Sequence, residues 1–393
     1  MKMNVTRVLH PIGQGAFYTE KFEYDGQQCN VVFDCGGTSS VIKERVEDYC
    51  NSLPCNGKDK KPTIDAVFIS HFHNDHVNGL KTLLTNAKVE RIFLPLLNKS
   101  DVYALSLSFV EKLGDPLYSG LIESAISGED LEWDLNEGKK IKIVRIRKVG
   151  DTEGNGDEEY DLDSDDDSTN EISSGTLIKP NKFTPWIFKT FNFGNAKKEK
   201  MEKLVETLKE NGFESSLEEL IKECKDKNKR KKIRDCYKKV LGKKKLNANS
   251  MVTYSGPEKG TIKVFHTNSW LSRPLGWRNL CCHKVWNDNL AGCMYFGDYE
   301  AKEIDQWEQY EKSFGYLINL LHVQQVPHHG AASNYNVLLN KPPKLNFISA
   351  GISNMYEHPS LWTLYVLNSY RVPWIWISED SERVVFEYDV SES

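Results

Sequence analysis

Long apolar runs are absent from this sequence. No stretch of its 393 residues approaches the roughly 20 apolar residues that a membrane-spanning helix needs. The first residues, Met1 to Arg7, lack the apolar core of a signal peptide. The nine cysteines are scattered and form no C-x-x-C pair, which is untypical of a disulfide scaffold. These absences argue against a membrane channel, and they predict a cytoplasmic protein with free thiols.

The composition is that of an ordinary soluble protein. Hydrophobic residues make up 39% of the chain, which is enough to build a sizeable core, and the formal net charge is −5. This modest charge hides a strong asymmetry, because residues 151–171 are dominated by Asp and Glu, whereas residues 197–245 are rich in Lys and Arg. Such runs are typical of exposed segments rather than of a packed core.

Strand-like and helix-like segments alternate on both sides of the charged region. Short β-branched runs predict strands at 30–37 and 64–69, with helices at 41–49 and 79–85 between and after them. Strand-like segments return after residue 247. This alternation favours the α/β class.

We therefore predict a single α/β domain that a charged segment interrupts. The domain is expected to comprise residues 1–150 and 246–393, with an insert at 151–245. Within the insert, we expect an acidic flexible loop at about 151–171 and a basic helical segment at about 197–245.

The segment S-H-F-H-N-D-H at residues 70–76 carries the most information, and it directly follows the strand predicted at 64–69. His71 and His73 occupy alternate positions, so in extended backbone both point to the same side and can ligate one metal ion. Asp75 and His76 fall where the chain turns into a helix, and they suit a second metal ion nearby. The alternative is a polar surface loop that is rich in histidine by chance.

Two later motifs fit the same chemistry. Asp298 follows an apolar strand, and its two carboxylate oxygens allow it to bridge two cations. His328 and His329 follow another strand and precede a glycine. One of these histidines can ligate the second metal ion, and the other can face the substrate.

Taken in order, the motifs of this chain resemble those of the metallo-β-lactamase superfamily. More narrowly, they resemble the metallo-β-lactamase domain of the competence DNA-uptake protein ComEC and its soluble relatives. The resemblance implies an αββα sandwich with the metals at one edge, and hydrolysis of phosphodiesters or related esters. The motifs that carry it are P-I-G-Q-G-A at 11–16, D-C-G-G at 34–37, S-H-F-H-N-D-H-V-N-G-L at 70–80, N-A-N-S-M-V at 247–252, G-D at 297–298, H-H-G at 328–330 and the segment from Ser349 to Pro359.

The resemblance also implies roles for individual residues around two divalent metal ions, zinc or manganese, that activate a water molecule. His329 would complete the second metal site, His328 would lie beside the substrate, and His358 would contact the leaving group or phosphate. The implied metal ligands are His71, His73, Asp75, His76, Asp298 and His329, the implied catalytic residues are Asp75, His328 and His358, and the supporting residues are Asp34 and Asn249.

The sequence departs from the family pattern at two informative places. Many relatives have a further histidine between the second and fourth motifs, where this chain offers Asn249. Fewer nitrogen ligands and more oxygen ligands favour manganese over zinc. Glu357 replaces a usual glycine, and its carboxylate beside the pocket would repel a polyanion.

The basic helical segment suggests contact with nucleic acid. Its density of positive charge is higher than a solvated helix face needs, although a solvated face remains the alternative. The acidic loop is either an exposed flexible loop or an electrostatic mimic of nucleic acid that covers a basic groove. The residues proposed for phosphate contact are Lys229, Arg230, Lys231, Lys232 and Arg234.

Three functions are consistent with these features. The first is a metal-dependent phosphodiesterase, in particular a nuclease. The second is a hydrolase of a small molecule such as a cyclic nucleotide, phosphocholine-type ester, lactone or thioester. The third is a partner-dependent effector subunit of a multi-protein bacterial system, in which the insert recruits a protein partner. None of the three involves a membrane.

Overall fold

The structure is a computed structural model, and it describes most of the chain. The described residues are 2–55, 61–97, 115–133, 140–151, 158–164, 169–181, 184–194, 198–213, 217–224, 226–241, 249–259, 263–266, 290–342 and 344–391.

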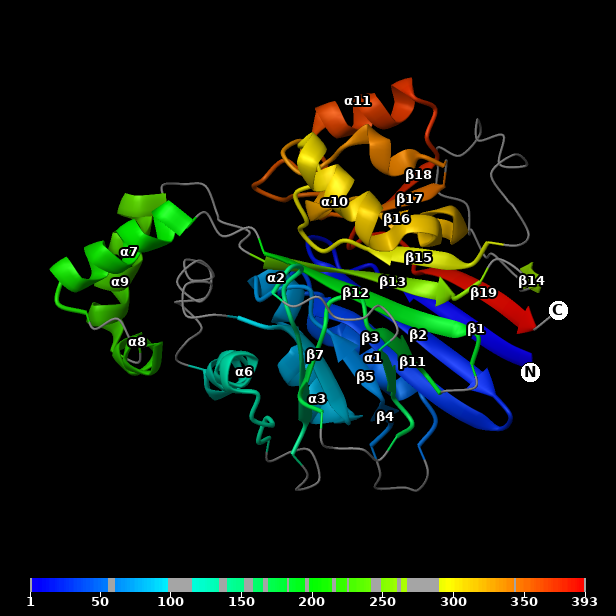
Figure 1. Ribbon diagram of the computed structural model, residues 1–393, viewed down its shortest axis with the longest axis horizontal. Coiled ribbons are helices and arrows are strands. Elements are labelled where there is room, and N and C mark those ends of the chain that lie inside the picture. The colour runs from blue at the N-terminus through cyan, green and yellow to red at the C-terminus, as the bar shows by residue number, and fades with distance from the viewer. Residues whose placement is uncertain are drawn as a thin grey trace.

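Two large β-sheets form the centre of the molecule (Figure 1). The nine-stranded sheet has the order β10-β8-β7-β5-β3-β2-β1-β19-β14, and the eight-stranded sheet has the order β18-β17-β16-β15-β13-β12-β11-β9. A third, two-stranded sheet pairs β4 with β6. The strands are β1 (Lys2–Leu9), β2 (Ala16–Tyr24), β3 (Gln27–Gly36), β4 (Thr63–Ile64), β5 (Ala66–Phe68), β6 (Lys88–Val89), β7 (Arg91–Pro95), β8 (Lys142–Ile146), β9 (Glu159–Asp161), β10 (Glu171–Ile172), β11 (Leu177–Lys179), β12 (Trp186–Gly194), β13 (Asn249–Pro257), β14 (Lys263–His266), β15 (Gly292–Tyr295), β16 (Leu321–Gln325), β17 (Leu345–Ser349), β18 (Trp374–Ile377) and β19 (Val384–Ser391).

Helices cover the outer face of each sheet and connect its parallel strands. The α-helices are α1 (Ile42–Ser52), α2 (Asn74–Val77), α3 (Leu80–Asn86), α6 (Pro116–Ser127), α7 (Lys198–Glu210), α8 (Leu217–Cys224), α9 (Lys227–Leu241), α10 (Ile304–Phe314) and α11 (Leu361–Ser369), and the 3-10 helices are η3 (Gly315–Leu320), η4 (His328–Gly330) and η5 (Val337–Asn340).

Three buried clusters define the layers. The central cluster joins the facing sides of the two sheets, as in the stack of Phe33 on Tyr295 with ring centroids 4.0 Å apart. A second cluster packs α1, α3 and α6 on the nine-stranded sheet, and a third packs α10 and α11 on the eight-stranded sheet. This order of layers is the αββα sandwich of the metallo-β-lactamase fold, so the expected fold class is confirmed.

The segment that interrupts the domain is shorter than the predicted insert at 151–245. β9, β10, β11 and β12 all lie within residues 151–245, yet all four are strands of the two large sheets. In β12, Trp186 and Phe188 face the central core, whereas Ile187 faces the outer one. Lys189, Thr190 and Asn192 interrupt the apolar run of β12, and charged segments lie before and after it, so this strand escaped the prediction.

The helices α7, α8 and α9 form the actual insertion, between β12 and β13. These two strands pair along their whole length, with Gly194 opposite Asn249, so the helices leave and rejoin the sheet at one point. Figure 1 shows them at the left of the molecule, and their buried residues, such as Leu204 and Tyr237, belong to the same hydrophobic cluster as those of α6.

Candidate metal centre

The loop after β5 carries the first histidines of the site. His73, the N-cap of α2, has an extended backbone conformation, and Asp75 and His76 lie in the first turn of that helix. His71 and His73 face the same carboxylate oxygen, Oδ2 of Asp298, at 3.4 Å from His71 Nε2 and 3.6 Å from His73 Nδ1. The i, i+2 spacing thus brings both rings to one point.

Asp298 lies between two groups of possible metal ligands. Its Oδ2 faces the first group, and its Oδ1 lies 3.3 Å from His76 Nε2 and 3.7 Å from His329 Nε2. Within each group the ligand atoms lie within 4.8 Å of one another. The first group is His71, His73 and Asp298, and the second is Asp75, His76 and His329.

Asp34 orients His76 from behind. One carboxylate oxygen, Oδ2, accepts a hydrogen bond from His76 Nδ1 at 2.8 Å, and Oδ1 accepts one from the backbone N–H of Ser70 at 2.7 Å. Asp34 has a φ of +52°, a left-handed conformation that Asp and Asn tolerate better than most residues. This contact leaves Nε2 of His76 facing Asp298.

The two histidines of η4 have different positions in the site. His329 donates from Nδ1 to the carbonyl of Ser349 at 2.8 Å, so its Nε2 presents a lone pair to the second group. His328 Nε2 lies 3.4 Å from Asp298 Oδ2, the oxygen that His71 and His73 also face. His328 is therefore close enough to act as a further nitrogen ligand of the first group or to contact a substrate there.

Both of these histidines have left-handed backbone conformations, with φ of +49° at His328 and +54° at His329. For a residue with a side chain this conformation costs on the order of 1–2 kcal/mol. Strain of this kind persists where the surrounding structure imposes it, which is typical of functional sites.

Three residues that the sequence did not single out hold the turn that presents Asp298. Ser250 Oγ accepts the backbone N–H of Asp298 at 3.1 Å, Asn334 Nδ2 donates to its carbonyl at 2.8 Å, and Gln325 Oε1 accepts the N–H of Gly297 at 3.0 Å. Ser250 could have been found from the sequence, because it belongs to the N-x-N-S motif. No sequence pattern pointed to Asn334 or Gln325.

Two glycine-containing motifs are explained by close approach to the metal-binding loop. A Cβ on Gly15 would lie 2.4 Å from the carbonyl oxygen of Asp75, and one on Gly36 would lie 2.5 Å from the backbone of His76. Any side chain at either position would displace α2 and its two ligands.

The electrostatics of the site follow from burial opposed by neighbouring charge. Burial raises the pKa of Asp75, but the neighbouring His329 and the charge of His76 outweigh it and hold this pKa well below its usual range. Burial also raises the pKa of Asp298, but the neighbouring imidazoles, first His328 and then His71, outweigh it and hold this pKa well below its usual range. For His71, burial lowers the pKa to about 4. The carboxylates are thus ionised at neutral pH, and His71 is neutral.

These groups fit divalent cations. Among the described residues, the Nε2 atoms of His71, His76 and His329 and the Oδ1 atom of Asp298 are buried without a hydrogen-bond partner. Buried polar atoms are normally paired, so lone pairs that converge without donors indicate a missing positive charge. Neutral imidazole, as at His71, and ionised carboxylate, as at Asp75 and Asp298, are also the forms that bind metal.

His358, the remaining predicted catalytic residue, lies at the mouth of the site. Its ring centroid is 5.4 Å from that of His328 and 6.4 Å from that of His329. Burial, followed by the charges of these two histidines, lowers its pKa to about 4. It therefore presents a neutral ring to whatever occupies the site.

Not all predicted residues gather at this centre. Asn249 begins β13 beside Ser250, but its side chain lies outside the described part of the structure. The five basic residues of the helical segment all belong to α9, away from the ligand groups. Of these, Lys229 pairs with Glu223 and Arg230 Nε donates to the carbonyl of Cys224.

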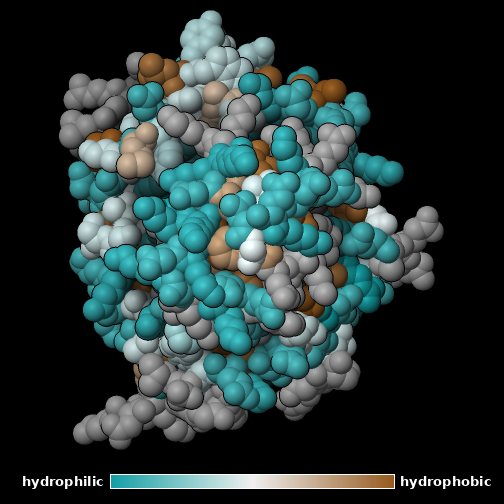
Figure 2. All heavy atoms as spheres, turned by 90° about the vertical axis from the view of Figure 1, so that its left-hand side faces the viewer, coloured by the Kyte–Doolittle hydropathy of each residue, from teal (hydrophilic) through white to brown (hydrophobic). Residues whose placement is uncertain are grey.

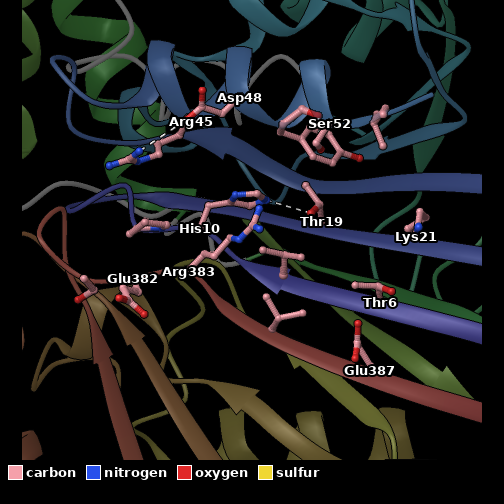
Figure 3. Close-up of a pocket in the computed structure, with 16 residues that line it drawn as sticks. Thr6, His10, Thr19, Lys21, Arg45, Asp48, Ser52, Glu382, Arg383 and Glu387 are labelled. Carbon is pink, nitrogen blue, oxygen red and sulfur yellow. Dashed lines mark hydrogen bonds and ion pairs between the residues drawn. The ribbon is translucent and has the colours of Figure 1, made fainter. Parts of the chain in front are cut away.

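A groove of about 790 Å³ lies elsewhere, on β1, β2, β19 and α1 (Figure 3). His10 is buried in it and hydrogen-bonded to Thr19, and the Arg383 side chain extends towards His10. None of the candidate metal ligands lines this groove. Its charges balance, since it holds three cationic and three anionic side chains: Lys21, Arg45, Arg383, Asp48, Glu382 and Glu387.

Comparison with known proteins agrees with the fold. Residues 22–165 match the family described as the metallo-beta-lactamase superfamily. No curated protein matches the sequence. Across the described residues, no helix has the length and apolarity required to cross a membrane.

Solved structures with a similar fold share little sequence with this chain. One is Zn(2+)-bound PqqB from Methylobacterium extorquens, with 9% identity, a TM-score of 0.43, and coverage of 96% of this chain and 99% of that one. Another is unliganded yeast PDE1, with 9% identity, a TM-score of 0.40, and coverage of 98% and 100%. The fold and the two ligand groups, with the family match over residues 22–165, support a metal-dependent hydrolase.

Proposed function

We propose that this protein is a phosphodiesterase that cleaves nucleic acid with the help of two divalent metal ions. The observation that carries the proposal is the position of Asp298, one oxygen of which faces each ligand group. Paired metal sites of this kind are typical of enzymes that displace an oxygen at phosphorus. The reaction fits the ComEC-type relatives that the motifs resemble.

Each metal ion would be held by residues from both sheets. His71, His73 and Asp298, with His328 available, would hold the first, and Asp75, His76 and His329 the second. Such ions, when bound, supply positive charge that lowers the pKa of a water molecule from about 15.7 towards 7. With His328 included, three imidazoles surround one oxygen of Asp298, a donor set that favours zinc more than the sequence suggested, with manganese as the alternative.

The side chains at the mouth have roles that follow from their exposure. Asp75 is the most exposed acid of the two groups, with a quarter of its side chain accessible, so it can accept a hydrogen bond from a nucleophilic water. His358, whose Nδ1 has no hydrogen-bond partner in the part of the chain that the structure describes, can donate a hydrogen bond to a phosphoryl oxygen. Asp34 keeps His76 in the tautomer that ligates through Nε2.

The basic face of α9 supports a polyanionic substrate. Among the described residues, five of its lysines form no ion pair, and all five are exposed; they are Lys227, Lys231, Lys232, Lys238 and Lys239. The helix has a single acidic residue, Asp235. Figure 2 faces this side of the molecule and shows it to be largely hydrophilic. The insertion leaves the sheet next to Ser250, so its root lies beside the turn that presents Asp298.

One observation favours a smaller substrate instead. Glu357 is exposed next to His358, with a φ of +57°, and its carboxylate at the mouth disfavours a long polyanion. A small-molecule ester would bind at the metal centre without contacting the lysines of α9. The two substrates differ in salt dependence, because only binding of a polynucleotide weakens steeply as salt rises.

The test is cleavage of plasmid DNA, single-stranded DNA, RNA and a generic phosphodiester, with zinc or manganese. The wild type is compared with Asp75→Ala and with Asp48→Ala, an exposed control on α1. Cleavage of polynucleotide that only Asp75→Ala abolishes would support the proposal. Hydrolysis of the generic ester alone would replace it with the small-molecule function.

A further inference from the structure

The loop from Gly351 to His358 is a fixed wall of the metal centre. Asn354 ties it together, because its Oδ1 accepts the backbone N–H of His358 at 2.8 Å and its Nδ2 donates to the carbonyl of Gly351 at 2.7 Å. Glu379 holds the other end by accepting the N–H of Ile352 at 3.0 Å. With these contacts in place, the loop needs no ligand to adopt its conformation.

The loop presents a series of rings that leads from the metal ligands to the surface. His358 lies next to His328, and the Tyr356 ring lies beyond it, with a centroid distance of 6.0 Å and an angle of 21° between the planes. The His329 and His358 rings are also nearly parallel, at 29°. Tyr356 ends the series, and 47% of its surface is exposed.

We propose that Tyr356 forms a stacking platform for the nucleobase next to the scissile phosphate, which makes the substrate a phosphodiester that carries a base. The proposal rests on the phosphodiesterase function. A phosphate at the ligand groups would lie beside His358, and a single sugar separates a phosphate from its base. The base would therefore reach the ring that follows His358, which is Tyr356.

The chemistry of the platform agrees with this ligand. Base stacking on aromatic side chains is tolerant of sequence and is the usual way in which proteins hold single-stranded nucleic acid. A protein partner is the competing explanation, since Met355 and Leu361, near Tyr356 in the chain, are 86% and 85% exposed. The nearly parallel orientation of the Tyr356 and His358 rings favours a flat ligand that extends out of the site.

The test uses a short single-stranded DNA with one cleavable phosphodiester, all other linkages being neutral methylphosphonates. Two further versions lack the base on one side or the other of that phosphodiester. The variants are Tyr356→Ala, Tyr356→Phe and, as a matched control, Tyr370→Ala, an exposed tyrosine after α11.

For the wild type, we expect loss of one of the two bases to lower kcat/KM about tenfold. Tyr356→Ala should cause the same loss on the complete substrate and none on the version that lacks that base. Tyr356→Phe and Tyr370→Ala should behave like the wild type. This pattern would establish the platform.

Other results would overturn the inference in distinguishable ways. If the wild type cleaves all versions equally and Tyr356→Ala changes nothing, stacking is wrong but the phosphodiesterase function stands. If Tyr356→Ala slows all versions equally, Tyr356 supports His358 and does not hold a base. If the wild type cleaves no version, the proposed function itself fails.

Discussion

His76 Nδ1 lies 2.8 Å from Asp34 Oδ2, and Nε2 of the same ring lies 3.3 Å from Asp298 Oδ1. Asp34 comes from β3 and Asp298 follows β15, so one imidazole links carboxylates from the two sheets. Burial lowers the pKa of His76, but the charges of Asp34 and Asp298 outweigh it and raise this pKa well above its usual value.

Asp34→Asn tests the orienting contact. Asn tolerates the left-handed backbone but lacks the negative charge, so we expect metal affinity and activity to fall about 10–100-fold. Metal affinity is measured by competition with a chelator. Asp48→Asn on the surface of α1 is the control, and equal affinities for both variants would show that Asp34 does not support a metal ligand.

Asp298 and Asp75 should differ in how many metal ions they retain. Because Asp298 faces both ligand groups, Asp298→Ala should lose most of both ions, whereas Asp75→Ala should keep about one per chain. Elemental analysis of the purified proteins measures this directly. Two ions in Asp298→Ala would rule out a bridging role.

Removal of the metal ions should destabilise the fold. Ligand at 100 times its dissociation constant contributes about 2.7 kcal/mol, which for a chain of this size is on the order of 5 °C in Tm. Thermal unfolding with and without a chelator checks this shift. Restoration by zinc or manganese, but not by magnesium, would match the imidazole-rich donor set.

Lys344 should make stability depend on pH. Its Nζ is buried without a hydrogen-bond partner, and burial lowers its pKa from 10.5 to about 7. Between these two pH values the unfolded chain holds a proton that the folded chain has lost. Because of Lys344, the free energy of unfolding therefore rises with pH across this window and decreases as pH falls.

Lys344→Met should therefore stabilise the protein most at or below pH 7, by at most about 5 kcal/mol. The gain should shrink towards pH 10.5. Denaturant unfolding at several pH values measures it, with the exposed Lys312→Met on α10 as control. A gain that is constant with pH would mean that the amine does not titrate in this range.

The lysines of α9 should determine how strongly salt weakens binding. Lys231→Gln with Lys232→Gln removes two exposed charges, so the slope of log K against log salt for single-stranded DNA should fall by about 0.7 per lost contact. Fluorescence anisotropy across a salt series measures the slope. Lys209→Gln on α7, where acids and bases alternate, should leave it unchanged, and an unchanged slope in the double variant would exclude α9 from the contact.

Local sequence was sufficient for much of the fold. The strands predicted at 30–37 and 64–69 correspond to β3 and to β4 with β5, and the helices at 41–49 and 79–85 correspond to α1 and α3. The two strands are short apolar runs, and the two helices have apolar residues at helical spacing, so both signals are local. In β12, polar residues interrupt the apolar run, and its recognition required the partner strand β13.

The sequence by itself determined which residue types could build a metal centre, because the spacing of His71 and His73 in extended backbone fixes the side to which both point. Only the tertiary structure decided that His328 approaches Asp298 Oδ2. It also decided that Ser250 and Asn334 bond the backbone N–H and carbonyl of Asp298. The position of the Tyr356 ring next to His358 likewise depends on it. These relationships join the two sheets and the loops at their shared edge. Such distances depend on how the layers pack against each other, which no local pattern contains.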